Sequence, residues 1–298
     1  MLWVLVIGYA AILLAVAVLQ RRLIYFPTKL SRSVAEPVAA QNGFTPWLGR
    51  NGQLFGWKMA ASSNSIGSVL VAHGNAGCAL DRDYLARPLH TALPLDVYVL
   101  EYPGYGAREG SPRLKDILAA GEEALAALPS ELPVYLVSES IGAGVVAHLA
   151  KVHPERVNGL ALFVPYDDLG NVGQAAMPWL PVKLLLRDRF QPARWLADYR
   201  GPMKVVLAGA DEVIPTRFGQ RLFDGYGGPK SLQVIPGARH NEVAEQSPEW
   251  WREVFAFWQS PGSQAANSSA IARRCAPTRA QPSPPTETNS CSSCIVIP

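Results

Sequence analysis

The middle of the chain alternates short apolar runs with longer stretches of helical periodicity. Short apolar runs are typical of buried strands, whereas the stretches between them place apolar residues on one helix face. The predicted strands are 68–72, 97–101, 134–137, 160–164, 203–208 and 232–235. The predicted helices are 81–93, 113–128, 145–153, 216–223 and 248–258. This alternation predicts an α/β domain with a mostly parallel central sheet and helices on both faces.

The flanking segments have other patterns. Residues 1–19 carry no charged side chain and are almost entirely apolar. Residues 23–57 are rich in Gly, Pro and aromatic residues, and Asn51-Gly52 predicts a hairpin of edge strands. After residue 259 the composition changes to Ser, Pro, Ala, Thr and Gln, which is typical of a disordered tail. The expected organisation is an anchor at 1–20, an α/β domain at 21–259 and a tail at 260–298.

The N-terminal apolar segment is long enough to cross a bilayer core of about 30 Å, at about 1.5 Å per residue. A cleaved signal peptide is the alternative, because Ala15-Val16-Ala17 has small residues at cleavage spacing. A retained single-pass anchor is favoured, since no Lys or Arg precedes the apolar run. Arg21 and Arg22 follow it instead, which by the positive-inside rule predicts that the rest of the chain is cytoplasmic.

Net charge and cysteine usage argue against a nucleic-acid-binding protein, a disulfide framework and a metal site. The net charge is +3, but the tail holds three arginines against one glutamate, so the remainder carries only +1. A nearly neutral body without a basic stripe argues against nucleic acid as the main partner. Cys275, Cys291 and Cys294 lie in the tail and only Cys78 in the body. The sequence therefore predicts neither a disulfide framework nor a metal site.

The segment PVYLVSESIGAG, residues 133–144, carries the strongest functional signal. A buried strand leads through Ser140 into a helix, one residue away from the G-x-S-x-G pattern of strand, turn and helix. That strained turn demands small residues two positions before and after the serine. Gly142 meets the demand, and Ser138 replaces the usual glycine with another small residue. Ser140 is therefore a candidate nucleophile, although many serines after strands only cap helices.

A glycine-containing loop, His73 to Gly77, follows the strand at 68–72. In parallel sheets the reactive residues collect at such carboxyl ends. An acyl-transfer enzyme needs two N–H donors where the carbonyl oxygen becomes negative, and we predict the backbone amides of Asn75 and Ile141. His73 is a candidate base, but we favour a structural role in ordering the loop, because another histidine is better placed.

Two further strand ends carry acid–base groups. Asp211 follows the strand at 203–208 and can accept a hydrogen bond from an imidazole, fixing its tautomer. One alternative is that Asp211 only caps the next helix. The other is that Asp167 or Asp168, instead of Asp211, accepts the hydrogen bond from the imidazole. His240 lies in the loop after the last strand, where it can take a serine proton and return it to the leaving group.

From about residue 22 to residue 258 the sequence resembles the α/β-hydrolase fold, and within it the membrane-anchored serine hydrolases that include acyl-protein thioesterase-like members. The order Ser, Asp, His is that of α/β-hydrolases. The matching stretches are RRLIYFP, VLVAHGNAG, LEYPGYGAREGSP, LVSESIG, GADEVIP and PGARHNE. The resemblance implies a triad of Ser140, Asp211 and His240, an uncleaved anchor, and no metal or organic cofactor. Ser138 and Cys78 depart from the family pattern without removing a catalytic group.

These features predict a membrane-anchored serine hydrolase that cleaves carboxylic esters or thioesters, including lipid-like acyl esters, through an acyl-enzyme. An insertion at 165–200 carries apolar residues that form either a small lid over an acyl chain or a helix covering the sheet. A serine peptidase is a less favoured variant, since the lid is small and propeller-like repeats are absent. The alternative from another class is a catalytically silent hydrolase fold that acts as an interaction module.

Overall fold

The predicted α/β sheet is present and has eight strands in the order β10-β9-β8-β7-β4-β6-β3-β2. The computed structural model describes residues 1–262, so most of the predicted tail and its three cysteines lie outside the described residues. The strands are β2 (Thr45–Leu48), β3 (Leu54–Met59), β4 (Ser68–Ala72), β6 (Asp96–Leu100), β7 (Val134–Glu139), β8 (Val157–Phe163), β9 (Met203–Ala208) and β10 (Lys230–Ile235). The strands from β10 to β6 run parallel, and β3 and β2 form the predicted antiparallel edge hairpin.

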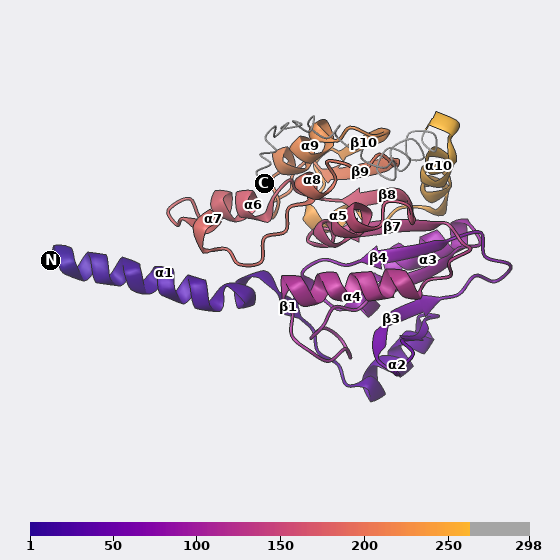
Figure 1. Cartoon of the computed structure of the whole chain (residues 1–298), viewed down its shortest axis with the longest axis horizontal. Coiled ribbons are helices and arrows are strands. Elements are labelled where there is room, and N and C mark those ends of the chain that lie inside the picture. Colours follow the sequence, from indigo (N-terminus) through magenta and orange to yellow (C-terminus); the bar gives the residue numbers. More distant parts are fainter. Residues whose placement is uncertain (263–298) are drawn as a thin grey trace, which may run out of the picture.

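Helices cover both faces of the sheet, as predicted (Figure 1). One face carries α4 (Leu114–Ala127), α5 (Gly142–Val152), α8 (Pro192–Trp195) and α9 (Thr216–Gly225). The other carries α2 (Arg32–Gln41), α3 (Asp83–Ala92) and α10 (Pro248–Gln259). The central strands are therefore apolar at nearly every position, because alternate residues such as Leu70 and Val71 pack into different cores.

Helix α2 is a departure from the sequence prediction, which expected only edge strands between residues 23 and 57. Pro37 lies inside α2 and disfavours a helix locally. Ala35 and Ala39 are fully buried on the face of α2 that packs against the domain. Tertiary packing of these small side chains outweighs the local preference.

Helix α1 (Leu2–Ile24) projects from the body (Figure 1). Among the described residues it is the one helix long and apolar enough to cross a membrane, with a mean hydropathy of 2.7. The chain then forms β1 (Phe26–Pro27), which pairs in parallel with β5 (Ala76–Gly77). The insertion after β8 contains α6 (Leu169–Ala176), α7 (Val182–Leu185) and α8.

The strand register brings four carboxyl ends to one edge of the sheet. Glu139 on β7 pairs with Phe163 on β8, and Phe163 pairs with Val206 on β9. Ala208 at the end of β9 pairs with Ile235 at the end of β10. The loops that follow these strands therefore emerge side by side.

A close contact between β8 and α10 makes the fold sensitive to one methyl group. A Cβ added at Gly159 would lie 2.5 Å from Trp258 Cδ1. Trp258 is fully buried and stacks on Tyr135, so it has no room to move. We expect Gly159→Ala to lower the free energy of unfolding by about 1–3 kcal/mol in urea titrations. Gly225→Ala, where no atom lies within 4 Å of the new Cβ, is the control and should cause no loss of stability.

Candidate active site

The backbone at Ser140 is strained. β7 ends at Glu139 and α5 begins at Gly142, and in the turn between them Ser140 has a φ of 52°. Non-glycine residues rarely adopt this left-handed conformation. The Ser140 N–H donates to the Phe163 carbonyl (2.9 Å), and its own carbonyl accepts from the Ala143 N–H (3.0 Å). The chain therefore forms the strand, turn and helix that the sequence predicts.

The surroundings of Ser138 and Gly142, two positions before and after Ser140, explain why the turn requires small side chains there. A Cβ added at Gly142 would lie 2.2 Å from the Ala72 carbonyl oxygen, so any side chain there would push α5 away from β4. Ser138 is fully buried, and its Oγ has no hydrogen-bond partner within residues 1–262. The departure from glycine at position 138 is thus accommodated inside the core.

Asp211 and His240 form a buried pair. Nδ1 of His240 lies 2.8 Å from Asp211 Oδ2 and 3.0 Å from Oδ1. Asp211 Oδ1 also accepts the backbone N–H groups of Val213 (2.9 Å) and Ile214 (2.7 Å). Asp211 thus bonds both the turn before α9 and the imidazole, and its catalytic role stays a prediction.

The loops that carry this pair are bonded to each other. The Gly209 N–H donates to the Ile235 carbonyl and the Ala210 N–H to the Ala238 carbonyl, both at 2.9 Å. The His240 N–H donates to Glu212 Oε2 (3.2 Å). These contacts fix the histidine loop after β10 against the aspartate loop after β9.

The runner-up carboxylates have other partners. Asp168 caps α6 through the Gly170 N–H (2.6 Å). Asp167 accepts from Asn171 Nδ2 (2.9 Å) and forms an ion pair with Arg221 (3.1 Å). Neither of the two aspartates is bonded to His240.

His73, the first residue of the loop after β4, is fully buried. Its Nδ1 lies 2.7 Å from the Gly74 carbonyl oxygen, and its ring packs on Tyr102 with centroids 3.9 Å apart. Its Nε2 is 3.6 Å from Glu101 Oε1, within the range of an ion pair but too far for a hydrogen bond. These contacts match the structural role that the sequence favoured for His73.

The Asn75 loop is held from three sides. The Asn75 carbonyl accepts from the Phe26 N–H (2.9 Å) and from the Tyr105 hydroxyl (2.7 Å). Its side-chain Nδ2 donates to the carbonyl of Ile24, the last residue of α1 (3.0 Å). The backbone amides of Asn75 and Ile141 have no hydrogen-bond partner among the residues that the structure describes.

Glu139 connects this loop region to the elbow, the turn between β7 and α5 that contains Ser140; the sequence analysis did not assign this role. Its carboxylate is buried and accepts a hydrogen bond from the Tyr84 hydroxyl (2.8 Å). Arg82 Nε lies 2.9 Å from Glu139 Oε2, in an ion pair without hydrogen-bond alignment, and Arg82 also donates to the Ala76 carbonyl (2.8 Å). Burial and the Glu139 carboxylate raise the pKa of the Tyr84 phenol above its usual value.

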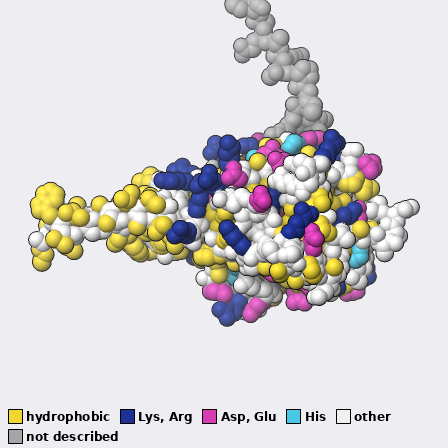
Figure 2. Space-filling view, turned by 90° about the horizontal axis from the view of Figure 1, so that it is seen from below, with side chains coloured by type: hydrophobic (Ala, Val, Ile, Leu, Met, Phe, Trp, Pro, Cys, Tyr) yellow, Lys and Arg dark blue, Asp and Glu magenta, His cyan; other side chains and the backbone are white. Residues whose placement is uncertain are grey.

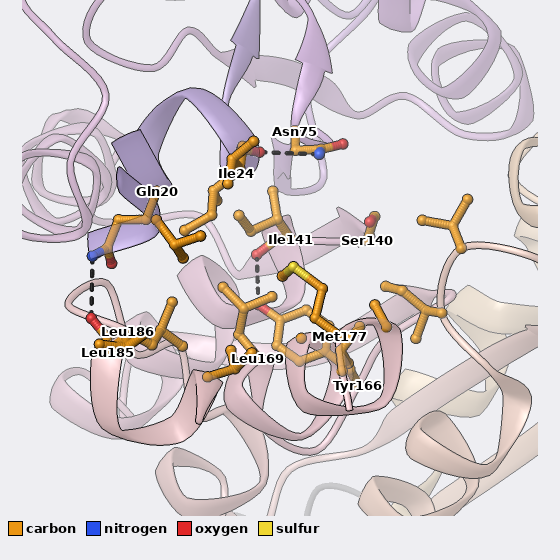
Figure 3. A pocket seen from close by; sticks show the side chains of 18 residues that line it. Gln20, Ile24, Asn75, Ser140, Ile141, Tyr166, Leu169, Met177, Leu185 and Leu186 are labelled. Atoms are coloured by element: carbon orange, nitrogen blue, oxygen red, sulfur yellow. Dashed lines mark hydrogen bonds between the residues drawn. The ribbon is translucent and has the colours of Figure 1, made fainter. Parts of the chain in front are cut away.

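An apolar cavity of about 230 Å³ opens beside Ser140 (Figure 3). Asn75 and Ile141 also line it, together with Val213 and Ile214, whose amides bond Asp211. Four side chains of α1 and several of α6 and α7 form the remaining walls. The cavity therefore connects the serine, its adjacent amides and the aspartate turn in one place.

The insertion at 165–200 has two kinds of contact with the rest of the domain. Leu169, Val172 and Met177 in and after α6 line the cavity, as a lid does. In contrast, α8 packs against α5 and covers the sheet. Different parts of the insertion thus line the cavity and cover the sheet, and a lid over an acyl chain stays a prediction.

Cys78, which directly follows the loop at residues 73–77, carries a thiol. Its side chain is buried, and burial together with the Glu101 carboxylate raises the pKa of the thiol to about 12. A thiol with this pKa is a poor nucleophile at neutral pH. Within residues 1–262 no group of three His, Cys, Asp or Glu side chains is arranged to hold a metal ion.

The fold defines the class: the chain has the α/β-hydrolase fold that solved esterase and lipolytic-enzyme structures share. No family model matches the sequence. The uncharacterized protein Rv2307c of Mycobacterium tuberculosis is 34% identical over 237 residues, covering 75% of this chain and 81% of that protein. The human alpha/beta hydrolase domain-containing protein 17B is 26% identical over 189 residues, covering 61% and 63%.

Solved structures share the fold. Est1E from Butyrivibrio proteoclasticus, with ferulic acid bound, superposes with a TM-score of 0.58 at 16% identity, covering 71% of this chain and 98% of Est1E. A structure from the work on LipS and LipT, two metagenome-derived lipolytic enzymes, gives a TM-score of 0.54 at 19% identity, covering 67% and 96%. The apolar helix α1 fits the membrane-anchored branch that the sequence resembles.

The buried pair of Arg82 and Glu139 leads to a stability prediction. Glu139→Ala leaves the Arg82 guanidinium buried without a counter-charge and the Tyr84 hydroxyl without its acceptor. We expect the free energy of unfolding to fall by about 3–5 kcal/mol in urea titrations. Glu36→Ala, which breaks the exposed pair with Arg32, is the control and should change stability little. Equal effects of the two variants would show that Glu139 does not hold the elbow.

Proposed function

We propose that the protein is a membrane-anchored serine hydrolase that cleaves carboxylic esters or thioesters with an apolar acyl part. The observation that carries the proposal is a left-handed Ser140 beside an apolar cavity whose wall includes the turn that holds the buried pair of Asp211 and His240. The fold alone would not decide, because α/β-hydrolases support many functions. The site residues supply each group that acyl transfer needs.

In the proposed reaction, Ser140 Oγ attacks the carbonyl carbon while His240 takes the hydroxyl proton. Since Nδ1 of His240 faces Asp211, the imidazole would use Nε2 for this transfer. His240 then gives the proton to the leaving alcohol or thiol, and an acyl-enzyme remains. Water attacks the acyl-enzyme with the same histidine as base, which releases the carboxylic acid and restores Ser140.

The negative oxygen of the tetrahedral intermediates needs donors. The backbone amides of Asn75 and Ile141 are assigned this role, because both residues line the cavity and neither amide has another partner among the described residues. Losing one such donor costs roughly a hundredfold or more in rate. An apolar cavity suits an acyl chain better than the polar backbone of a peptide, which favours an esterase over a peptidase.

Retention of the N-terminal helix is also part of the proposal. Tyr9, which lies before the candidate cleavage site, donates through its hydroxyl to the Trp179 carbonyl (2.9 Å). Val16, inside the Ala15-Val16-Ala17 segment, lines the cavity. Cleavage would remove both contacts. Arg21 and Arg22 at the end of α1 support a cytoplasmic catalytic domain through the positive-inside rule.

The nucleophile assignment predicts that Ser140→Ala abolishes turnover of a p-nitrophenyl ester and labelling by a fluorophosphonate, with an unchanged thermal unfolding curve. The matched control is Ser138→Ala, which removes a buried hydroxyl two residues earlier and should keep both activities. Wild-type protein that neither turns over esters nor reacts with the probe would support the silent interaction module instead.

The role of Asp211 predicts a specific kinetic change. In Asp211→Asn the carboxylate that orients the imidazole becomes an amide, and we expect kcat to fall by up to about 10⁴, with KM nearly unchanged. Asp167→Asn alters the runner-up aspartate and serves as the control, with kcat close to that of the wild type. The reverse ranking of the two variants in steady-state kinetics would assign the role to Asp167.

A further inference from the structure

We propose that α1 is a wall of the substrate pocket as well as an anchor, and that the acyl chain of the substrate enters along α1 from the lipid bilayer. This inference rests on the proposed hydrolase function and deepens it. It assigns the substrate class as an ester or thioester whose acyl chain is held in the membrane, and it makes Val16 a specificity-determining residue.

The first observation is the face that α1 presents to the cavity. Its lining residues are Val16, Gln20, Leu23 and Ile24, whose spacing places them on one side of a helix. Ile24 lies at the end nearest the Asn75 loop, to which its carbonyl is bonded. From Ile24 to Val16 the helix rises about 12 Å at 1.5 Å per residue. The cavity thus extends along α1 from the catalytic end toward the N-terminal half of the helix.

The second observation is that the opposite wall is fastened to α1 by polar contacts. The Gln20 side chain donates to the Leu185 carbonyl (3.1 Å) and accepts from the Arg187 N–H (2.7 Å), as Figure 3 shows for the first bond. Asp188 forms an ion pair with Arg21 (3.1 Å) and accepts from the Tyr25 hydroxyl (3.0 Å). The lid and the anchor therefore form one unit around the pocket.

The third observation concerns length. The whole of α1 is 23 residues, or about 35 Å, but the part before Val16 rises only about 21 Å. A hydrocarbon core is about 30 Å thick, so the part of α1 before the cavity is too short to span it alone. For α1 to cross the membrane, about 20 of its residues must lie in the core, so Val16 and Gln20 lie at the level of the lipid chains while Leu23 and Ile24 lie beyond them. The far end of the pocket then faces the bilayer.

The surface around this end of the body agrees with that placement. Trp179 and Leu184, between and within the lid helices, are 58% and 80% exposed. Tryptophan is enriched where proteins meet the membrane interface. Lys and Arg side chains gather where α1 meets the body, as Figure 2 shows, and such clusters attract anionic lipid headgroups. Exposed Arg22 and Lys29 lie together at the end of α1, and exposed Lys183 and Arg187 lie in and after α7, which contacts α1.

The test uses the full-length protein in phosphatidylcholine vesicles and two esters, p-nitrophenyl butyrate in water and p-nitrophenyl palmitate in the bilayer. Val16→Trp fills the far part of the cavity, whereas Val18→Trp places the same ring on a 62% exposed position that does not line it. We expect Val16→Trp to lower kcat/KM for palmitate at least about tenfold more than kcat/KM for butyrate. Val18→Trp should change neither. Equal palmitate rates in the two variants would overturn the proposal.

A second measurement separates this proposal from the proposed function. A palmitate analogue with a photoreactive diazirine on its chain is added to the same vesicles, and labelled peptides are mapped by mass spectrometry. We expect labelling within α6 and α7 in the wild type and in Val18→Trp, and at least about fivefold less in Val16→Trp. Equal labelling of α6 and α7 in Val16→Trp and in the wild type would contradict the pocket assignment. Because this readout needs no turnover, a protein that hydrolyses neither ester would refute the hydrolase while the labelling still decides where the chain binds.

Discussion

The strained turn at Ser140 is the constraint on which the rest of the site depends. A left-handed conformation costs a non-glycine residue roughly 1–2 kcal/mol, and Val164 at the adjacent strand end has the same kind of conformation, with a φ of 44°. Such strain persists only where the surroundings over-determine it. Here the bond from the Ser140 N–H to β8 and the contact of Gly142 with the end of β4 hold the turn between two buried strands. The large cores on both faces of the sheet supply the stability that maintains it.

The groups around that turn are held by contacts that converge from distant parts of the chain. Glu139, next to the serine, is joined to Arg82 and Tyr84, and Asn75 is joined to Ile24 at the end of α1. The short parallel pair of β1 and β5 continues this attachment. The N-terminal helix and the loop at Asn75 are therefore directly connected, so that a change in the position of α1 would reach the neighbourhood of Ser140.

Helices α6 and α7 and the residues after them are attached to α1 as well as to the domain. In the described part of the chain, α6 and α7 close the cavity against α1 rather than against the sheet alone, and Gln20 and Asp188 supply the polar contacts between them. Buried polar groups need such partners, because an unpaired one would cost about 1–3 kcal/mol. The pairing thus specifies one position of α7 and residues 185–188 relative to α1.

The sequence by itself determined the alternating strands and helices, the elbow at Ser140 and the candidate acid–base residues, because apolar periodicity and short turn patterns are local signals. It did not reveal α2, since the buried contacts of Ala35 and Ala39 outweigh the local effect of Pro37. Nor did it reveal Glu139 as a partner of Arg82, or Gln20 as a link to residues 185 and 187. These roles were decided only by the tertiary structure, because each depends on groups that folding brings together from positions far apart in the chain.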